Sequence, residues 1–268
     1  MRKLIMMAVV FALAMVPGTA LAQSGEGTVT VVHGVPDLAV DVYVNGDLTL
    51  SDFQFGTVTD PLTLPAGDYD IAIRAAGADA ASDPVLAETV ALPAGANATI
   101  EANLDGAGAP VISAWVNGIS AIDAGNGRVT VRHTAAAPNV DILANDGALF
   151  SDVPNGAEGV ADVPAGDYNV KVTAAGDAST VVTEVAALTI PEGTNVIVYA
   201  IGDLEGGSFQ LAVQTIAGLQ AAPNGVPTGT GGDLGAAMPT WFVAMLAIAG
   251  VLIVAGGVSG LQTARRQR

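Results

Sequence analysis

Hydrophobic and polar residues alternate along most of the chain between residues 28 and 218, and Gly, Pro, Asn or Asp interrupts the pattern at short intervals. Val29, Val31 and His33 fall on one face of a first expected strand, because successive side chains of a strand point to opposite sides. Short alternating segments that are separated by turn residues are typical of β-sandwich domains. The pattern therefore predicts an all-β fold.

Further strands follow from the same alternation. Val40, Val42 and Val44 share one face of a second strand, and the Asn45-Gly46 pair after it favours a two-residue hairpin turn, since both central residues of that turn need a positive φ. Other expected strands cover residues 69–74, 85–92, 98–104 and 110–116. Six or seven strands in about 90 residues favour two sheets packed face to face.

The chain contains two copies of one pattern. The segment TVVH at residues 30–33 returns as TVRH at 130–133, and PAGDY at residues 65–69 returns letter for letter at 164–168. Self-similarity of this kind indicates tandem copies of one structural unit. We therefore predict two tandem immunoglobulin-like or transthyretin-like β-sandwich domains. The first covers residues 28–118, a linker covers residues 119–127, and the second covers residues 128–218.

A turn motif that both copies share leads into a tyrosine. Proline restricts φ and glycine permits a sharp reversal, so the chain can pass from one sheet to the other just before a tyrosine-led strand. This arrangement is typical of a tyrosine corner, in which the ring packs inward and the hydroxyl bonds to a nearby backbone group. We therefore predict structural roles for Gly67 and Tyr69 and for their equivalents, Gly166 and Tyr168.

The order of these features resembles the family known as domain of unknown function 4397. The resemblance rests on the Val-His strand, the Val-Asp-Val strand with its Asn-Gly turn, the Ser-Asp pair, and the LPAGDY and Pro-x-Gly-x-Asn segments. It covers both copies, and it implies an exported bacterial surface protein with tandem β-sandwiches and a C-terminal anchor, without implying an activity. The LPAG-x-Tyr stretch is also similar to transthyretin-like and PEGA-type sandwiches. The second copy departs from the pattern where residues 135–138 replace the turn at residues 34–37.

Both ends of the chain are typical of membrane targeting. A basic start, an apolar run and a small-residue cleavage site predict a signal peptide over residues 1–22. Residues 241–261 contain no charge and are long enough to span a bilayer as a helix. Trp241-Phe242 begin this segment and arginines follow it, which predicts an extracellular body and a cytoplasmic C-terminus at the bacterial cell membrane. A Gly/Pro-rich stalk over residues 219–240 and a basic tail over residues 262–268 complete the predicted layout.

The charge of the chain narrows the possible partners. There are 26 Asp and Glu against 9 Lys and Arg, which gives a formal net charge of −17. All of the acidic residues but only four basic ones lie between the two membrane-directed segments, so this region carries a net charge of −22. A field of this sign disfavours nucleic acid and anionic lipid surfaces as partners. Because the chain has no cysteine, disulfides, thiol nucleophiles and zinc-ribbon sites are excluded.

Catalytic motifs are not apparent in the sequence. His33 and His133 occupy the same position in the two copies, so one copy never holds a pair of histidines. A partnership with Asp41 or Asp141 on the next strand is the alternative to a structural role for each histidine. However, no serine lies in a G-x-S-x-G context and no G-x-x-x-x-G-K-[ST] phosphate loop is present. We therefore expect no enzyme activity and no cofactor.

Aspartates near the ends of the expected strands are the remaining candidates for a ligand site. Carboxylate oxygens are the hard ligands that calcium prefers, although the spacing here does not match an EF-hand loop. The alternative is that these side chains form a solvated surface. The candidates are Asp37, Asp41, Asp47 and Asp52 in the first copy, and Asp141, Asp146 and Asp152 in the second.

Together these features predict a non-catalytic, membrane-anchored cell-surface protein that displays two β-sandwich modules for adhesion or for binding an envelope protein or polymer. Two alternatives stay open: a structural envelope spacer without a diffusible ligand, and a calcium- or small-molecule-binding ectodomain. The expected contact sites are the loops that differ most between the copies. These are residues 34–38 against 134–139, and residues 54–61 against 154–161.

Overall fold

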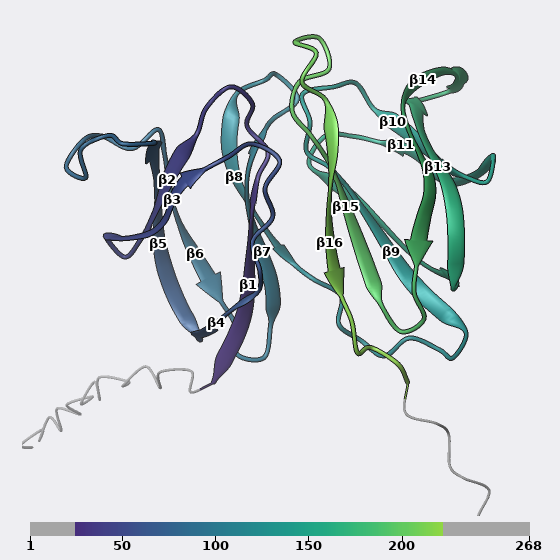
Figure 1. Cartoon of the computed structure of the whole chain (residues 1–268), viewed down its shortest axis with the longest axis horizontal. Helices are drawn as coiled ribbons and strands as arrows, with labels where there is room; N and C mark the ends of the chain where they lie inside the picture. The colour runs from purple at the N-terminus through teal and green to yellow at the C-terminus, as the bar shows by residue number, and fades with distance from the viewer. Residues whose placement is uncertain (1–24, 222–268) are drawn as a thin grey trace, which may run out of the picture. The chain divides into compact units, whose positions relative to one another are not determined.

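The computed structural model describes residues 25–221, and over this range the regular elements are the β-strands β1 to β16, in four four-stranded sheets (Figure 1). The predicted all-β class is therefore confirmed. Among these residues there is no helix with the length and apolar character needed to cross a membrane. The predicted signal peptide, transmembrane segment and tail lie outside the described residues, as does the predicted stalk from residue 222 onward.

The first eight strands form two sheets that face each other. One sheet has the order β4-β1-β7-β8 and the other has the order β3-β2-β5-β6. Strands β1 and β7 run parallel, whereas the other neighbouring strands of this sandwich run antiparallel. The strands are β1 (Glu26–His33), β2 (Val40–Val44), β3 (Asp47–Phe53), β4 (Leu62–Pro65), β5 (Gly67–Ala75), β6 (Leu86–Leu92), β7 (Asn97–Leu104) and β8 (Pro110–Val116).

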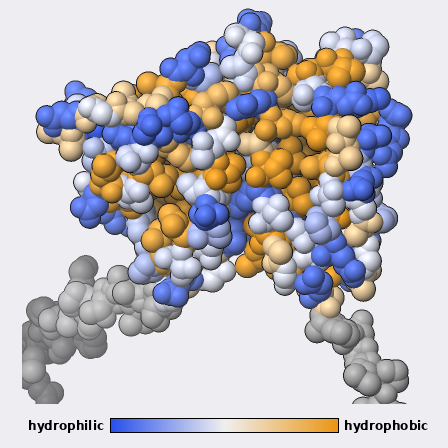
Figure 2. All heavy atoms as spheres, in the orientation of Figure 1, coloured by the Kyte–Doolittle hydropathy of each residue, from blue (hydrophilic) through white to orange (hydrophobic). Residues whose placement is uncertain are grey.

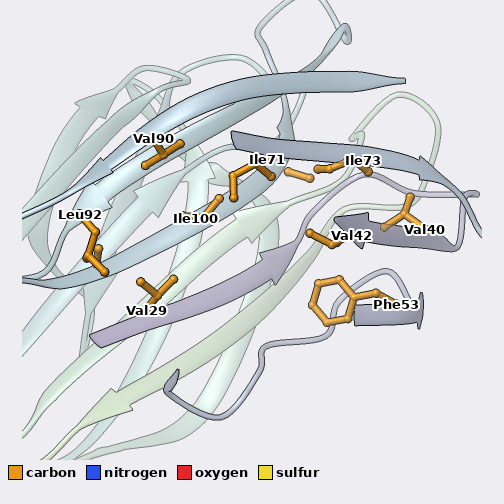
Figure 3. Packing of buried hydrophobic residues seen from close by; sticks show 11 residues of the cluster. Val29, Val40, Val42, Phe53, Ile71, Ile73, Val90, Leu92 and Ile100 are labelled. Carbon is orange, nitrogen blue, oxygen red and sulfur yellow. The ribbon is translucent and has the colours of Figure 1, made fainter. Parts of the chain in front are cut away.

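The core of the first sandwich follows from the alternation in its strands. Val29 of β1 and Ile100 of β7 come from one sheet, Val42 of β2 and Ile71 of β5 come from the other, and all four side chains are buried. Figure 3 shows these residues in the space between the two sheets. Burying an aliphatic side chain of this size contributes about 1.5–3 kcal/mol. The two apolar faces therefore hold the sandwich together.

The last eight strands repeat this arrangement as a second sandwich. Its sheets have the orders β12-β9-β15-β16 and β11-β10-β13-β14, and β9 pairs with β15 in parallel as β1 does with β7. Val131 and Val172 belong to its buried core. The strands are β9 (Asn126–His133), β10 (Val140–Ala144), β11 (Gly147–Val153), β12 (Ala157–Pro164), β13 (Gly166–Ala174), β14 (Asp177–Ile190), β15 (Asn195–Ile201) and β16 (Gln210–Ile216).

Each sandwich has eight strands, rather than the six or seven that the alternation predicts. The strand that the pattern misses is β4 in the first copy, where Leu64 and Pro65 lie in a segment rich in turn residues. β4 pairs antiparallel with β1, so that Leu62 lies opposite Val29. Only Ala66 separates β4 from β5, which belongs to the other sheet. The predicted passage of the chain between sheets is confirmed at this point. The finer likeness to immunoglobulin-like or transthyretin-like domains stays a prediction.

The first hairpin forms where the sequence predicts it. Asn45 and Gly46 have φ values of 52° and 87°, and they connect β2 to β3 with Val44 opposite Asp47. In the second copy, Asp146 takes the place of this glycine at a φ of 64°. Its carboxylate accepts a 2.7 Å bond from Lys171 on β13, which ties the turn to a neighbouring strand.

One edge of the two sandwiches differs between the copies. β4 covers four residues, whereas its equivalent β12 covers eight and pairs with β9 along its whole length. Pro61 immediately precedes β4, and proline has no backbone N–H to donate to a neighbouring strand. The edge of the first sandwich is therefore less completely paired than the same edge of the second.

Candidate functional site

Asp41 and Asp141, the calcium candidates of the second strand in each copy, bind backbone N–H groups. Asp41 accepts hydrogen bonds from the N–H groups of Asp52 at 2.8 Å and Gly77 at 2.9 Å. Both bonds lower the pKa of the Asp41 carboxyl, and the bond from Asp52 has the larger effect. In the second copy, Asp141 accepts the equivalent pair of bonds, and its pKa is lowered for the same reason. Each carboxylate thus joins its own strand to the next strand of the hairpin, β3 or β11, and to the turn that follows β5 or β13.

The other aspartates of the calcium hypothesis bond to different partners or face solvent. The carboxylate of Asp52, in β3, accepts a 2.7 Å bond from the Gln54 amide. Asp37 and Asp47 are exposed. Asp146 pairs with Lys171, and the carboxylate of Asp152 accepts a 2.7 Å bond from the amide of Asn139. In the part of the chain that the structure describes, no three His, Asp or Glu side chains come together where they could hold a metal ion.

The two histidines hold the loop that follows the first strand of each sandwich. Nε2 of His33 lies 2.7 Å from the carbonyl oxygen of Leu38, and Nε2 of His133 lies 3.0 Å from that of Pro138. Both side chains are buried, and burial lowers the pKa of each. A carbonyl oxygen only accepts hydrogen bonds, so each Nε2 is the donor. The structure therefore places each histidine against backbone and not against Asp41 or Asp141.

The tyrosines of the shared turn motif bond back to the residue four positions earlier. The hydroxyl of Tyr69 donates to the carbonyl of Pro65 at 2.6 Å, and the hydroxyl of Tyr168 donates to that of Pro164 at 2.7 Å. Both rings are half-buried and pack against the core of their own sandwich. At Gly67, for which the turn motif predicts a structural role, a Cβ atom would meet no other atom within 4 Å, so close packing does not require glycine there. The same is true of Gly166.

A buried polar layer that the alternation of residues does not predict joins the two sandwiches. It lies where the sheet containing β7 meets the sheet containing β9 and β15. Its residues bond from one sandwich to the other and are buried or half-buried, and we call them the inter-sandwich layer. They are Thr30, Thr99, Glu101, Trp115, Asn117, Arg132, Thr134, Tyr199 and Gln214.

Arg132 is at the centre of this layer, with only 1% of its surface exposed. Its guanidinium donates to the Tyr199 hydroxyl at 2.8 Å, to the Asn117 side-chain oxygen at 2.9 Å and to the Glu158 carboxylate at 3.0 Å. It also lies over the Trp115 ring, 4.7 Å from the centroid. Asn117 and Trp115 belong to the first sandwich, so one side chain bridges both. A buried guanidinium is tolerated when its donors are paired in this way.

Glu101 is a fully buried carboxyl in the same layer. It accepts a 2.7 Å hydrogen bond from the Thr134 hydroxyl and a 3.1 Å bond from the Trp115 indole N–H. Burial raises the pKa of Glu101 to about 7, although these bonds and the charge of Arg132 act in the opposite direction. This side chain therefore changes its charge near neutral pH.

Tyr199 connects Arg132 to the part of the layer formed by β16 and β1. Its hydroxyl donates to the side-chain oxygen of Gln214 at 2.6 Å, and the Gln214 amide donates to the Thr30 hydroxyl at 3.1 Å. Burial raises the pKa of Tyr199 to about 12, so its hydroxyl keeps its proton at neutral pH. The hydrogen-bonded chain from Arg132 to Thr30 thus crosses the boundary between the sandwiches once, at the bond from Gln214 to Thr30.

An apolar cluster continues the contact beside the polar layer. Val32 and Phe55 of the first sandwich pack with Ile197 and Ile201 of the second, and Val32, Ile197 and Ile201 are fully buried. A Cβ on Gly202 would lie 3.0 Å from the Phe55 ring, so the two sandwiches approach closely there. The interface therefore combines a polar part and an apolar part.

The interface between the sandwiches contains the same pair of positions twice, with the two copies exchanged. Phe55 of the first copy approaches Gly202 of the second. Their equivalents are Asn155 of the second copy and Leu104 of the first, and the Asn155 amide donates to the Leu104 carbonyl at 3.0 Å. A surface that contacts its own equivalent in this way is the mark of a twofold arrangement. The two copies therefore meet through the same face.

The loops predicted as contact sites are partly used in this interface. Each of the four contributes at least one residue to it: Gly34 accepts a 3.2 Å bond from the Gly202 N–H, Thr134 bonds to Glu101, Phe55 joins the apolar cluster, and Asn155 bonds to Leu104. Contact between the sandwiches thus accounts for part of the sequence difference between these loops.

One signal in the sequence could have revealed the inter-sandwich layer. Thr99, Glu101 and Asn103 alternate with apolar residues, a pattern that is also typical of a solvent-facing strand. The informative feature is that equivalent positions of the two copies hold side chains of different charge and polarity. Glu101 corresponds to Tyr199, and Val32 corresponds to Arg132. These differences place unlike residues on the two sides of the boundary, such as Glu101 of the first copy against Thr134 of the second.

Comparison with known proteins identifies a family. The family model described as Domain of unknown function (DUF4397) matches residues 27–143 and again residues 134–225. The first match runs past the first sandwich into β10 of the second. No curated protein matches the chain.

Two solved structures show weak similarity. The Bacillus anthracis TIE protein has 16% sequence identity and a TM-score of 0.21, over 65% of this chain and 33% of that one. This chain therefore spans about a third of the TIE protein chain. CBMbc, of family CBM26, from Eubacterium rectale Amy13K was solved in complex with maltoheptaose. It has 13% identity and a TM-score of 0.24, over 74% of this chain and 98% of that one.

Proposed function

This chain belongs to the DUF4397 family as a tandem member, and we propose that it is a non-catalytic protein of the bacterial cell membrane that displays two joined sandwiches outside the cell to bind an envelope protein or polymer. The signal-peptide pattern of residues 1–22 and the uncharged segment 241–261 with its basic flank support this placement.

One observation carries the non-catalytic part of the proposal. The histidines and central aspartates that the sequence offers for chemistry are bonded to backbone in both copies. His33 and His133 bond to carbonyl oxygens, and Asp41 and Asp141 each accept two backbone N–H groups. A catalytic acid, base or nucleophile must instead reach a substrate.

The loop between β5 and β6 is the best candidate for the displayed contact. Residues 76–85 are mostly exposed and include the acidic side chains Asp79 and Asp83. In the second copy, a short turn at Ala175 and Gly176 joins β13 to β14 instead. Loops of this kind on a rigid scaffold commonly carry recognition. None of the contacts described above between the sandwiches involves this loop.

The membrane topology can be tested on intact cells. Protease added from outside should remove the two sandwiches and should spare an epitope placed at the C-terminus, because the predicted tail is cytoplasmic. As a matched control, permeabilised cells should lose the epitope. Digestion of the epitope in intact cells would contradict the proposed orientation.

The binding role can be tested with a loop exchange. We expect the full chain to bind isolated cell envelope saturably, and we expect binding to fall at least tenfold when the short turn of the second copy replaces residues 76–85. Circular dichroism and the melting temperature check that the variant is folded. If the wild-type chain shows no saturable binding, the spacer function is favoured. A turnover activity that His33→Ala abolishes would overturn the non-catalytic assignment.

A further inference from the structure

An apolar cavity of about 120 Å³ lies between the two sheets of the first sandwich. Val42 and Ile71 line it from one sheet, and Val29, Ala98 and Ile100 line it from the other. Figure 3 shows most of these side chains around the space between the sheets. Protein cores contain few voids larger than a water molecule. An engineered apolar cavity of about 150 Å³ stays dry and binds benzene or xenon. The size and lining of this cavity are thus those of a site for a small hydrocarbon group.

The second sandwich provides an internal comparison. The two voids found in its core have volumes of about 20 Å³ each. At lining positions, Thr49 and Leu50 of the first copy correspond to the larger residues Leu149 and Phe150. Phe53 is larger than Val153, its equivalent in the second copy, but the Phe53 ring is stacked on His33 with the ring centroids 5.7 Å apart. The cavity is therefore a feature of the first copy and not of the shared fold.

The lining reaches the molecular surface between the edge strands β3 and β4. Thr49 of β3 is exposed, and Leu62 of β4 is 36% exposed. At the equivalent edge of the second sandwich, the ring of Phe150 covers Gly159 of β12 so closely that a Cβ there would lie 2.6 Å from the ring. The short β4 and the leucine at position 50 leave the edge of the first sandwich without this cover.

We propose that the first sandwich binds an apolar group of about the size of benzene in this cavity, inserted between β3 and β4. The lining is almost wholly aliphatic. Tyr69 is one of the lining residues, and its hydroxyl already donates to Pro65. The cavity therefore selects for hydrocarbon and offers little to a polar ligand. The group is either a free small hydrocarbon or the end of an acyl chain, since the two share this chemistry.

Methyl-selective NMR of the full chain tests the proposal with benzene as the probe. Benzene should shift the methyl signals of Val42, Ile71 and Ile100 saturably. The equivalent methyls of the second sandwich, Ile142 and Val198 among them, report any general partitioning of benzene and should not shift. Equal shifts in both sandwiches, or no saturable shift in the first, would overturn the proposal.

Sodium decanoate in a second titration identifies the source of the group. If decanoate displaces benzene, the site accepts the end of an acyl chain. If benzene binds and decanoate does not displace it, the site takes a free small hydrocarbon. Either result supports the cavity as a hydrocarbon site.

Residues of the second copy provide the blocking variant. Leu50→Phe together with Thr49→Leu should weaken benzene binding at least tenfold, because the larger side chains close the edge and fill the space. Leu48→Ala, at an exposed residue of the same strand, is the matched control and should leave the affinity unchanged. If the double variant fails to fold, the single variant Leu50→Phe takes its place in the benzene titration. Benzene binding of wild-type strength in a folded blocking variant would overturn the proposed location.

Discussion

At the scale of single residues, the tyrosine of each shared turn has a testable part in stability. Tyr69→Phe keeps the ring contacts but removes the hydrogen bond to Pro65. Because this bond is near solvent, we expect the free energy of unfolding to fall by about 0.5–1.5 kcal/mol. Denaturant unfolding measures the change. Tyr69→Ala, which also removes the ring, should cost more, and unchanged stability in both variants would contradict a structural role.

Glu101 makes the stability of the protein depend on pH. Its folded pKa is about 7, above the ordinary value of 4.5, so the folded state binds its proton more tightly than the unfolded state. Its stabilising effect is complete below about pH 4.5 and is lost as the pH rises through 7.

The variant Glu101→Gln, which cannot lose a proton, isolates this effect. We expect it to be more stable relative to wild type at pH 8 than at pH 4.5. Burial lowers the pKa of His33 and His133, which acts in the opposite direction, but both proteins contain the histidines and their effect cancels. Denaturant unfolding at both pH values gives the difference. A difference that does not change with pH would contradict the raised pKa.

At the scale of elements, the edge strands distinguish the two copies. Gly159 of β12 lies under the Phe150 ring of β11, so a methyl group at this position has no room. Gly159→Ala should lower the free energy of unfolding by about 1–3 kcal/mol through overpacking. Gly67→Ala is the control, because its Cβ would meet open space, and it should stay within about 0.5 kcal/mol of wild type. Thermal unfolding measures both variants, and equal losses would contradict this packing.

Exposed apolar side chains on the edge strands explain why these edges need cover of the kind that the Phe150 ring gives Gly159. Figure 2 shows apolar residues among hydrophilic ones on the face that is drawn. Leu48, Val160 and Val213 are large apolar side chains that are about half exposed. Exposed strand edges with apolar side chains favour pairing with other chains. The many acidic side chains of the described strands and loops counteract such association by repulsion.

At the scale of the whole molecule, Arg132 couples the two sandwiches. Arg132→Ala removes hydrogen bonds to Tyr199 and Asn117 inside a buried layer, so we expect a loss of about 1–3 kcal/mol. Calorimetry should show the transitions of the two sandwiches separating, because the contact that links them is weakened. Lys171→Ala is the control, since its ion pair with Asp146 is exposed and should matter little. One unchanged transition in Arg132→Ala would contradict the coupling.

The sequence by itself determined the local structure and its repetition. Alternation at Val40, Val42 and Val44 and the Asn45-Gly46 turn predict β2 and its hairpin, because both depend on side-chain period and on φ within a few residues. The repeat at offset 100 indicates two copies without any structure. Asp41 and Asp141 show the limit of this reasoning. The sequence reveals two carboxylates at equivalent positions, but which backbone groups occupy them depends on how the chain bends around them.

Only the tertiary structure decided which outer faces are buried. Thr99 and Glu101 on β7, and Arg132 on β9, have the pattern of solvent-facing positions, and they become an interface because the two copies meet through this face. The sequence did not predict the cavity of the first sandwich either, since the cavity depends on how far β4 extends and where the rings of Phe53 and Phe150 lie. Contacts between residues distant in sequence depend on the relative placement of sheets, and periodicity along one strand carries no information about that placement.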